Sequence, residues 1–185
     1  MKVLLHVCCG PCAIHPLDVL KKQGHEVHGF FYNPNIYPEE EFLRRKKAVE
    51  QFSQVSGMKI NSLAYQLQEY RDAIKDLNDK QQRCGKCWHL RLRKAAEFAK
   101  KNDFDAFTTT LLVSPYQDHD SLKNLGHQIQ EAEKIDFLYM DFREGFSEGQ
   151  NEAKKLNLYR QKYCGCAYSL YENNNKPALN PPVNK

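Results

Sequence analysis

The sequence lacks the features that mark secreted and membrane-spanning proteins. Its first ten residues, MKVLLHVCCG, contain one lysine and an apolar stretch too short for the core of a signal peptide, and no small-residue cleavage site follows. No stretch approaches the roughly 20 apolar residues that a membrane-spanning helix needs. We therefore expect a cytoplasmic protein with no membrane partner, in a compartment where structural disulfides are rare.

A glycine-rich phosphate loop is also missing where many α/β proteins carry one. Residues 2–7 (KVLLHV) read as a buried strand, and the next five residues are CCGPC, with one glycine and three cysteines. A PP-loop-like nucleotide hydrolase or thiolation enzyme would need glycines there to cradle a phosphate. This alternative is therefore weak, and thiols stand in the place of the phosphate loop.

Composition places the chain among ordinary globular proteins. Its 185 residues suit one domain, 41% of them are hydrophobic and 27% are charged. The formal net charge of +4 is mildly basic, which is compatible with a nucleic-acid partner but equally compatible with an ordinary solvated surface.

Strand and helix patterns alternate along the chain. We predict strands near residues 2–7, 27–32, 59–65, 105–112 and 137–142, and helices from Pro11, over 39–56, 87–101 and 148–157, and from an N-cap at Ser121. Such alternation predicts an α/β fold with a parallel sheet covered by helices on both faces. Sites in these folds lie outside the carboxyl ends of the strands, so the CCGPC turn falls at the functional edge.

No internal repeat or domain boundary is evident. We expect one domain over residues 1–172, with residues 66–87 as a lid or small insertion. Residues 173–185, which include NKPALNPPVNK, are polar and rich in proline, and we expect a disordered tail there.

The seven cysteines form three groups and none stands alone. The groups are Cys8, Cys9 and Cys12, then Cys84 and Cys87 in RCGKCWHLRLR, then Cys164 and Cys166 in YCGCAYS. Buried structural cysteines placed at random would not cluster in this way. In a reducing compartment, such clustering indicates metal binding or redox chemistry.

The spacing of the thiols leaves several chemistries open. The CxxC pair Cys84 and Cys87 can direct two thiolates to one metal, and the adjacent Cys8 and Cys9 can turn toward one site at the bend. Together they give four sulfurs, which suit a tetrahedral zinc or a [4Fe–4S] cluster. The Cys164-Gly-Cys166 pair can close a small, strained and labile disulfide ring, or act as a further pair of metal ligands. Cys12 is then a further ligand, a partner for a second metal or a buried thiol at the helix start.

The motifs together resemble the QueH-type epoxyqueuosine reductases. The resemblance rests on HVCCGPC, YNPNIYP, RCGKCWHLRLR, FTTTLLVSPYQDHD, DFREGF and LYRQKYCGCAYS, in this order, from about Lys2 to Ser169. It implies a Rossmann-like fold similar to the PP-loop and HUP nucleotide-binding domains. The implied activity is the last step of queuosine synthesis, in which the epoxide of epoxyqueuosine at the tRNA wobble position is reduced.

The resemblance also implies a set of site residues. It implies a [4Fe–4S] cluster on Cys8, Cys9, Cys84 and Cys87, a redox-active pair at Cys164 and Cys166, and no cobalamin. Asp72 or Asp141 are alternative cluster ligands, and Cys12 with the CxC pair could hold an additional iron. The candidate proton donors are Tyr163, Asp141 and His6. The implied partners are a tRNA carrying epoxyqueuosine and an electron donor of unknown identity.

Basic residues flank the predicted site. Residues 44–47 read RRKK, and a second group surrounds the CxxC motif, namely Arg83, Lys86, Arg91, Arg93 and Lys94. Such side chains suit contacts with RNA phosphates, and the alternative for the first run is a solvated helix face. His6 reads better as a satisfied core histidine than as a proton donor. A zinc-stabilised RNA-binding module is the non-enzymatic alternative.

Overall fold

A computed structural model describes residues 1–173 and confirms the α/β prediction. Five parallel strands form one sheet in the order β3-β2-β1-β4-β5. Their bounds are β1 Lys2–His6, β2 Glu26–Phe31, β3 Ile60–Ser62, β4 Ala106–Thr109 and β5 Asp136–Phe137. The strand order reverses between β1 and β4, and ligands of open α/β sheets bind in the crevice at this point.

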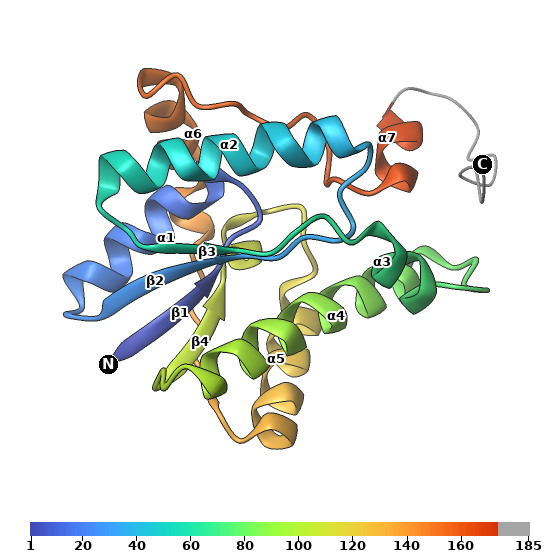
Figure 1. The fold of residues 1–185 in the computed structure, drawn as a ribbon, viewed down its shortest axis with the longest axis horizontal. Helices are drawn as coiled ribbons and strands as arrows, with labels where there is room; N and C mark the ends of the chain where they lie inside the picture. The colour runs from blue at the N-terminus through green and yellow to red at the C-terminus, as the bar shows by residue number, and fades with distance from the viewer. Residues whose placement is uncertain (174–185) are drawn as a thin grey trace.

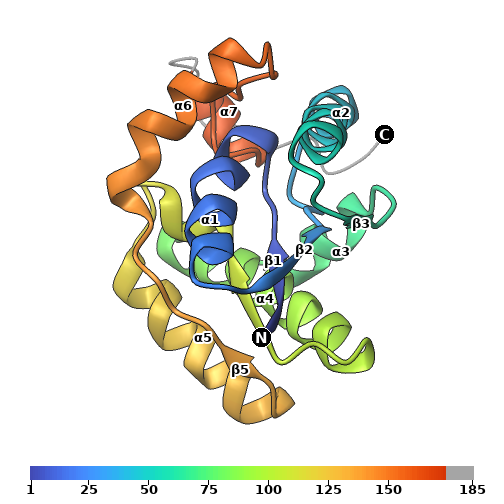
Figure 2. The ribbon, with the colours of Figure 1, turned by 90° about the vertical axis from the view of Figure 1, so that its left-hand side faces the viewer.

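Helices cover both faces of the sheet, as Figures 1 and 2 show. Helices α1, α2 and α6 lie on one face, and α4 and α5 lie on the other. The α-helices are α1 Gly10–Lys22, α2 Glu39–Ser56, α3 Leu67–Ala73, α4 Lys80–Lys101, α5 His119–Glu133, α6 Phe146–Lys155 and α7 Ala167–Asn173, and short 3-10 helices span Thr110–Val113 and Arg143–Gly145.

The central strand β1 is apolar because both faces of the sheet are covered. Val3, Leu4 and Leu5 are fully buried, which explains the unbroken hydrophobic run in the sequence. Helix α1 follows β1 after three residues and packs closely against α2. A Cβ atom at Gly10 would lie 2.8 Å from the main-chain oxygen of Ala48, so glycine permits this close approach. The contact fixes the start of α1, directly after Cys9.

Two predicted helix starts need correction. Helix α4 begins at Lys80 rather than at Cys87, because the Asp79 side chain accepts a hydrogen bond of 2.8 Å from the Gln82 amide and caps the helix. Cys84 and Cys87 therefore lie inside the helix and not at its start. Helix α5 is capped by Asp118 rather than by Ser121. The predicted strand at 137–142 is real but short, since β5 spans only Asp136–Phe137.

The predicted lid at 66–87 contains α3 and the first turns of α4. Tyr70 and Ile74 pack with Cys87 in a small apolar cluster of their own, separate from the main core. Of the predicted tail, only Asn173 lies within the described residues, at the end of α7. Among the described helices, none combines the length and apolar character needed to cross a bilayer.

Candidate metal and redox site

Three sulfur atoms gather at the carboxyl end of β1. The Cys8, Cys9 and Cys12 Sγ atoms lie within 4.8 Å of one another, and within residues 1–173 no other group of three or more potential metal ligands is this compact. Cys9 is the N-cap residue of α1, and Cys12 lies in its first turn after Pro11. Cys9 and Cys12 are buried, whereas Cys8 is partly exposed. The bend after the strand thus turns all three thiols to one side.

Cys8 links the segments that follow β1 and β4, the two strands that flank the crevice. Its amide donates a hydrogen bond of 3.0 Å to Thr110 Oγ1, and that hydroxyl lies 3.2 Å from Cys8 Sγ as a donor. Hydrogen bonds from the Cys12 and Cys9 thiols lower the pKa of Cys8 well below its usual value. The bond to Cys8 conversely raises the pKa of Cys12.

A second group of thiols lies between α4 and the segment before α7. Burial raises the pKa of Cys87 to about 12, and the nearby Cys164 and Cys166 raise it further. Burial is the main cause that raises the pKa of the Tyr70 hydroxyl. The charges of Cys166 and Cys87 and a hydrogen bond with Cys166 raise this pKa further. The structure thus places the predicted redox pair beside Cys87, and Tyr70 beside that pair as a protonated hydroxyl.

Arg45 holds the main chain of the Cys164-Gly165-Cys166 turn. Its Nη1 and Nη2 atoms donate hydrogen bonds of 3.0 Å to the carbonyl oxygens of Cys164 and Tyr163. Its Nε donates to Glu41 Oε1 at 2.8 Å, and both side chains are buried. The Gly165 carbonyl in turn accepts a hydrogen bond of 2.8 Å from the Tyr37 amide. The turn is therefore fixed from α2 and from the loop before it.

Arg91 points from α4 toward both thiol groups. Its Nη2 donates a hydrogen bond of 2.7 Å to Asn33 Oδ1, and its Nη1 lies 3.9 Å from Cys87 Sγ. Asn33 donates to the Val7 carbonyl at 2.9 Å, which links Arg91 to the strand end that carries Cys8. The positive charge of Arg91 lowers the pKa values of Cys8 and Cys87.

Arg45 and Arg91 belong to the two basic groups that suit RNA contacts by sequence. In the structure both side chains point inward instead. Arg45 and Arg91 are only 1% and 2% exposed. The helical spacing of the two arginines indicates this inward orientation. Arg45 is three residues after the buried Phe42, and Arg91 is four residues after Cys87, so each shares the inner face of its helix.

The two predicted carboxylates are exposed and hydrogen-bonded to neighbouring side chains. Asp141 is exposed and paired with Arg143, whose Nε lies 2.8 Å from Asp141 Oδ1. The Arg143 hydrogen bonds lower the pKa of Asp141 to about 2, so at neutral pH this carboxylate has no proton to donate. Asp72 is exposed on α3 and accepts a hydrogen bond from Gln68. The geometry favours neither residue as a metal ligand or proton donor.

His6 fits the interpretation as a core histidine. It is fully buried, its Nδ1 bonds to Thr109 Oγ1 at 2.8 Å and its Nε2 to the Tyr32 carbonyl at 3.1 Å. Burial lowers its pKa to about 3, so the ring is neutral at physiological pH. Both ring nitrogens have partners, and the ring fastens β1 to β4 and to the end of β2.

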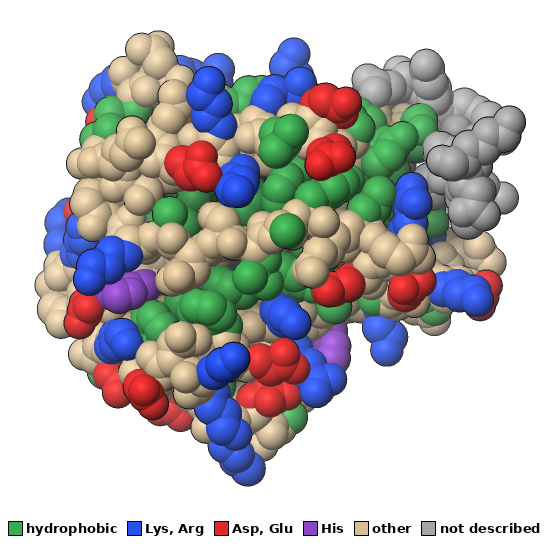
Figure 3. Space-filling view, in the orientation of Figure 1, with side chains coloured by type: hydrophobic (Ala, Val, Ile, Leu, Met, Phe, Trp, Pro, Cys, Tyr) green, Lys and Arg blue, Asp and Glu red, His purple; other side chains and the backbone are tan. Residues whose placement is uncertain are grey.

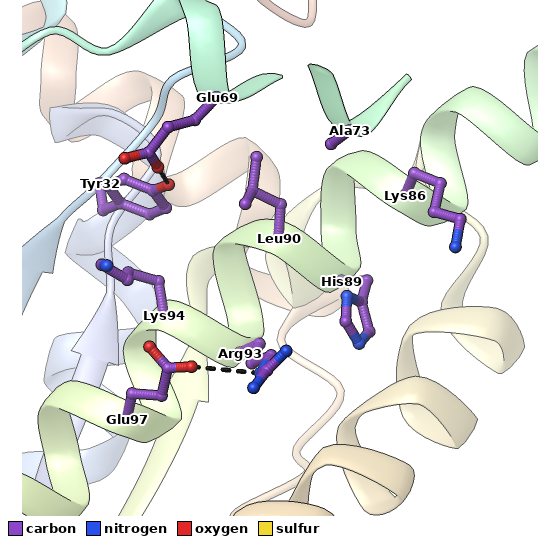
Figure 4. A pocket seen from close by; sticks show the side chains of 9 residues that line it. All are labelled: Tyr32, Glu69, Ala73, Lys86, His89, Leu90, Arg93, Lys94 and Glu97. Atoms are coloured by element: carbon purple, nitrogen blue, oxygen red, sulfur yellow. Dashed lines mark hydrogen bonds and ion pairs between the residues drawn. The ribbon is translucent and has the colours of Figure 1, made fainter. Parts of the chain in front are cut away.

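A pocket of about 350 Å³ is lined by residues of α3 and α4 and by Tyr32. Figure 4 shows these side chains. Its lining comprises Tyr32, Glu69, Ala73, Lys86, His89, Leu90, Arg93, Lys94 and Glu97. Arg93 is engaged with Glu97 at 3.1 Å and Glu133 at 3.0 Å. Lys86 and Lys94 form no ion pair with the described residues. Glu69 and Ala73 of α3 line this pocket, whereas Tyr70 of the same helix lies beside the thiols.

Charges of both signs are interspersed on the face shown in Figure 3. No continuous basic field covers this face, which agrees with the modest net charge of +4. Any contact with RNA phosphates on this side therefore depends on individual basic side chains.

The chemistry of the grouped donors fits a thiophilic metal centre. Three sulfur donors lie together, and further thiols from α4 and the CxC turn lie in the same region. Thiolates are the ligands preferred by zinc and iron–sulfur clusters, whereas magnesium and calcium prefer oxygen donors. The residues present thus suit the cluster that the sequence predicts and do not suit an oxygen-bound cation.

Solved structures with the same fold include tRNA-modifying proteins. A predicted subunit of tRNA methyltransferase from Methanocaldococcus jannaschii aligns with a TM-score of 0.57 at 12% identity, over 83% of this chain and 75% of that chain. The U34-tRNA thiolase NcsA from Methanococcus maripaludis, solved with its [4Fe-4S] cluster, gives a TM-score of 0.57 at 15% identity, over 91% and 60%. At these identities the likeness establishes the fold alone.

Sequence comparison reaches further. Residues 3–172 match the family described as epoxyqueuosine reductase QueH. The epoxyqueuosine reductase QueH of Thermotoga maritima is 36% identical, covering 95% of this chain and 94% of that protein, and that of Haemophilus influenzae is 36% identical, covering 94% and 73%. The protein of the same name from Dehalococcoides mccartyi is 34% identical, covering 95% and 96%. The chain therefore belongs to the epoxyqueuosine reductase QueH family.

Proposed function

We propose that this protein reduces the epoxide of epoxyqueuosine in tRNA to the alkene of queuosine. The observation that carries the proposal is the grouping of three sulfur donors at the strand crossover, with a CxC pair held nearby by a buried arginine. The match to the family over nearly the whole chain supports the same conclusion. The resemblance to this family implies no cobalamin.

The proposed reaction balances with one dithiol for each epoxide. Removing the epoxide oxygen breaks two C–O bonds, forms a C=C bond and releases water, and it consumes two electrons and two protons. The Cys164 and Cys166 thiols supply both when they oxidise to a disulfide. An external reductant, acting as a thiol or an electron carrier, must then restore the dithiol before the next turnover.

We place the metal centre at the thiols of the crossover. Cys8 and Cys9 belong to the grouped sulfurs, Cys12 supplies a third, and Cys84 and Cys87 are the predicted remaining ligands from α4. When bound, a [4Fe–4S] cluster supplies single electrons and a Lewis-acidic iron for the epoxide oxygen. Cys12 with the CxC pair, or Asp72, are the proposed ligands of an additional iron.

Protein side chains prepare the redox pair for its role. Arg45 fixes the Cys164 carbonyl, and Tyr37 fixes the Gly165 carbonyl, so the two thiols are carried on a rigid turn. Desolvation of the Cys164 thiol, followed by the neighbouring Cys166, raises the pKa of Cys164 to about 11, so this thiol carries its proton at neutral pH. A protonated thiol delivers a proton together with its electron.

The tRNA substrate must extend a base out of its loop to reach the thiols. Enzymes that act on a base flip it from its stack into a pocket, at a cost of a few kcal/mol. Lys86 and Lys94 line the pocket formed by α3 and α4, form no ion pair with the described residues and suit the phosphates that flank such a base. We therefore propose that the anticodon loop contacts α4 at this pocket.

Anaerobic reconstitution followed by a tRNA assay tests the proposal. Protein reconstituted with iron and sulfide, supplied with a strong reductant and epoxyqueuosine-containing tRNA, should convert the modified nucleoside to queuosine. Cys8→Ser removes the sulfur that accepts a hydrogen bond from the Thr110 hydroxyl, and this variant is the matched inactive control. Iron-loaded protein that makes no queuosine would refute the activity. A colourless protein that binds zinc and tRNA without turnover would instead support an RNA-binding module.

A further inference from the structure

Arg91 carries a buried positive charge that no carboxylate balances. The residue is 2% exposed, and no Asp or Glu among the described residues forms an ion pair with it. Its Nη2 bonds to the neutral amide of Asn33, and its Nε is buried with no hydrogen-bond partner. Arg45 differs, since Glu41 balances its charge at 2.8 Å.

An uncompensated buried charge is costly enough to require an explanation. After relaxation, the penalty for removing one ion from water still amounts to several kcal/mol, a large part of the stability of a small domain. Proteins therefore pair such charges or use them to bind a charged group. The functional form of this protein must place an anion beside Arg91.

The groups that surround Arg91 identify that anion. Cys87 Sγ lies 3.9 Å from Nη1, and the charge of Arg91 also acts on Cys8 and Cys164, so it reaches all three groups of thiols. The other hydrogen-bond partner of the guanidinium, Asn33, is a neutral amide. Thiolates are thus the available source of negative charge.

A phosphate of the RNA is a poorer candidate. Arg91 is almost completely buried, and it lies on the helix face of Cys87 rather than on the face of the pocket. Lys86 and Lys94 line the open hollow on the other side of α4, where a phosphate has access.

We infer that Arg91 is the counter-cation of the metal–thiolate centre, retaining the metal and setting its reduction potential. The inference rests on the metal centre of the proposed function and adds the residue that balances its charge. Several thiolates on one metal or cluster give a net negative charge, which a fixed guanidinium stabilises. Arg91 also orients Cys87 and, through Asn33, the strand end before Cys8. It is a positioning residue.

Three variants test the inference. Arg91→Gln removes the charge and keeps a hydrogen-bond donor for Asn33, and Arg91→Lys keeps the charge. Arg93→Gln is the matched control, because Arg93 lies on the same helix but is exposed and paired with Glu133. We expect Arg91→Gln to weaken metal retention against a chelator by about 10- to 100-fold. Arg91→Lys and the control should remain within a few-fold of the parent protein.

Two further measurements exclude a merely structural role. Arg91→Gln should shift the midpoint potential of the metal-loaded protein to more negative values, because the more negatively charged reduced state loses its counter-cation. The Tm of the Arg91→Gln variant should be lower than that of the parent when metal is bound. In the metal-free proteins it should not be lower, because the unbalanced charge of Arg91 destabilises the parent. Equal Tm losses in both forms, or unchanged potential and retention, would overturn the inference. Metal content of the parent protein separately decides whether the proposed centre exists.

Discussion

Arg45 Nη1 donates a hydrogen bond of 3.0 Å to the carbonyl oxygen of Cys164, a residue 119 positions further along the chain. A buried guanidinium on α2 thus holds the main chain of the C-terminal CxC turn. Because Arg45 also bonds to the preceding carbonyl of Tyr163, the turn cannot rotate freely about either peptide. The orientation of the proposed redox pair is therefore determined from a distant helix.

Gly165→Ala should damage this turn. Gly165 has a φ of +128°, which disfavours side chains, and an added Cβ would lie 3.1 Å from Arg45 Nη1. We expect a loss of roughly 1–3 kcal/mol in the free energy of unfolding, and a larger proportional loss of turnover. Urea unfolding and the tRNA assay measure the two effects.

Gly85→Ala is the matched control for this change. Gly85 lies inside α4, and a Cβ there meets no atom within 4 Å. The substitution should stabilise the protein by about 0.5–1 kcal/mol, because alanine has the higher helix propensity. A Gly165→Ala protein as stable and active as the parent would contradict the account of the turn.

The cysteine variants should separate metal binding from redox turnover. Cys8→Ser and Cys9→Ser remove grouped sulfurs and should lower the iron content of anaerobically reconstituted protein, and Cys12→Ser should do the same if it is a ligand. Cys164→Ser and Cys166→Ser should keep the iron and lose turnover. Iron and sulfide analysis with an absorption spectrum provides the measurement. Loss of iron in Cys164→Ser would show that the CxC pair ligates the metal.

Sequence patterns predicted the layout of the fold because strands and helices alternate with clear periodicity. The buried strand β1 and the helix 39–56 needed no tertiary information. The start of α4 was missed because residues 66–82 are polar, and the Asp79 cap is visible only once the helix is seen. Tertiary packing, rather than helix propensity, decides where the helix begins in such polar segments.

The candidate site was predicted in its residue types and less well in its grouping. The cysteine spacing identified the thiols, but adjacency in space depends on how α4 and the segment before α7 approach the crossover. That approach brings Cys87 to the CxC pair, whereas Cys8, Cys9 and Cys12 are grouped locally by the turn from β1 into α1. The inward orientation of Arg45 and Arg91 was not predicted, because both residues lie in runs of basic side chains. Only their register with Phe42 and Cys87 distinguishes Arg45 and Arg91 from the solvated residues beside them.

Lys86→Ala and Lys94→Ala should weaken tRNA binding. Both lysines line the pocket without an ion pair among the described residues, so their charge is available to phosphates. Each variant should lower affinity for every tRNA sequence alike and reduce the slope of log affinity against log salt by about one. Lys101→Ala, at the far end of the same helix, is the control. Filter binding at several salt concentrations would contradict the prediction if the pocket variants matched this control.

Asp141→Asn should leave turnover at neutral pH nearly unchanged, because the carboxylate is ionised in its pair with Arg143. The pair holds the pKa of Asp141 at about 2, below the usual 3.8, so its stabilisation is present above about pH 4 and is lost as the pH falls toward 2. An exposed pair of this kind contributes at most about 1 kcal/mol. Tm values of parent and variant should therefore differ slightly at pH 7 and converge near pH 2. A severe loss of turnover at pH 7 would restore Asp141 as a catalytic residue.

A single-turnover experiment tests the central claim most directly. Reduced, iron-loaded protein is separated from all external reductant and mixed with epoxyqueuosine-containing tRNA, after which queuosine is quantified and the Cys164–Cys166 disulfide is measured by peptide mass spectrometry. The account predicts that queuosine and this disulfide form in equal amounts, up to one of each per chain. Queuosine formed without the disulfide, or no queuosine from fully loaded protein, would contradict it.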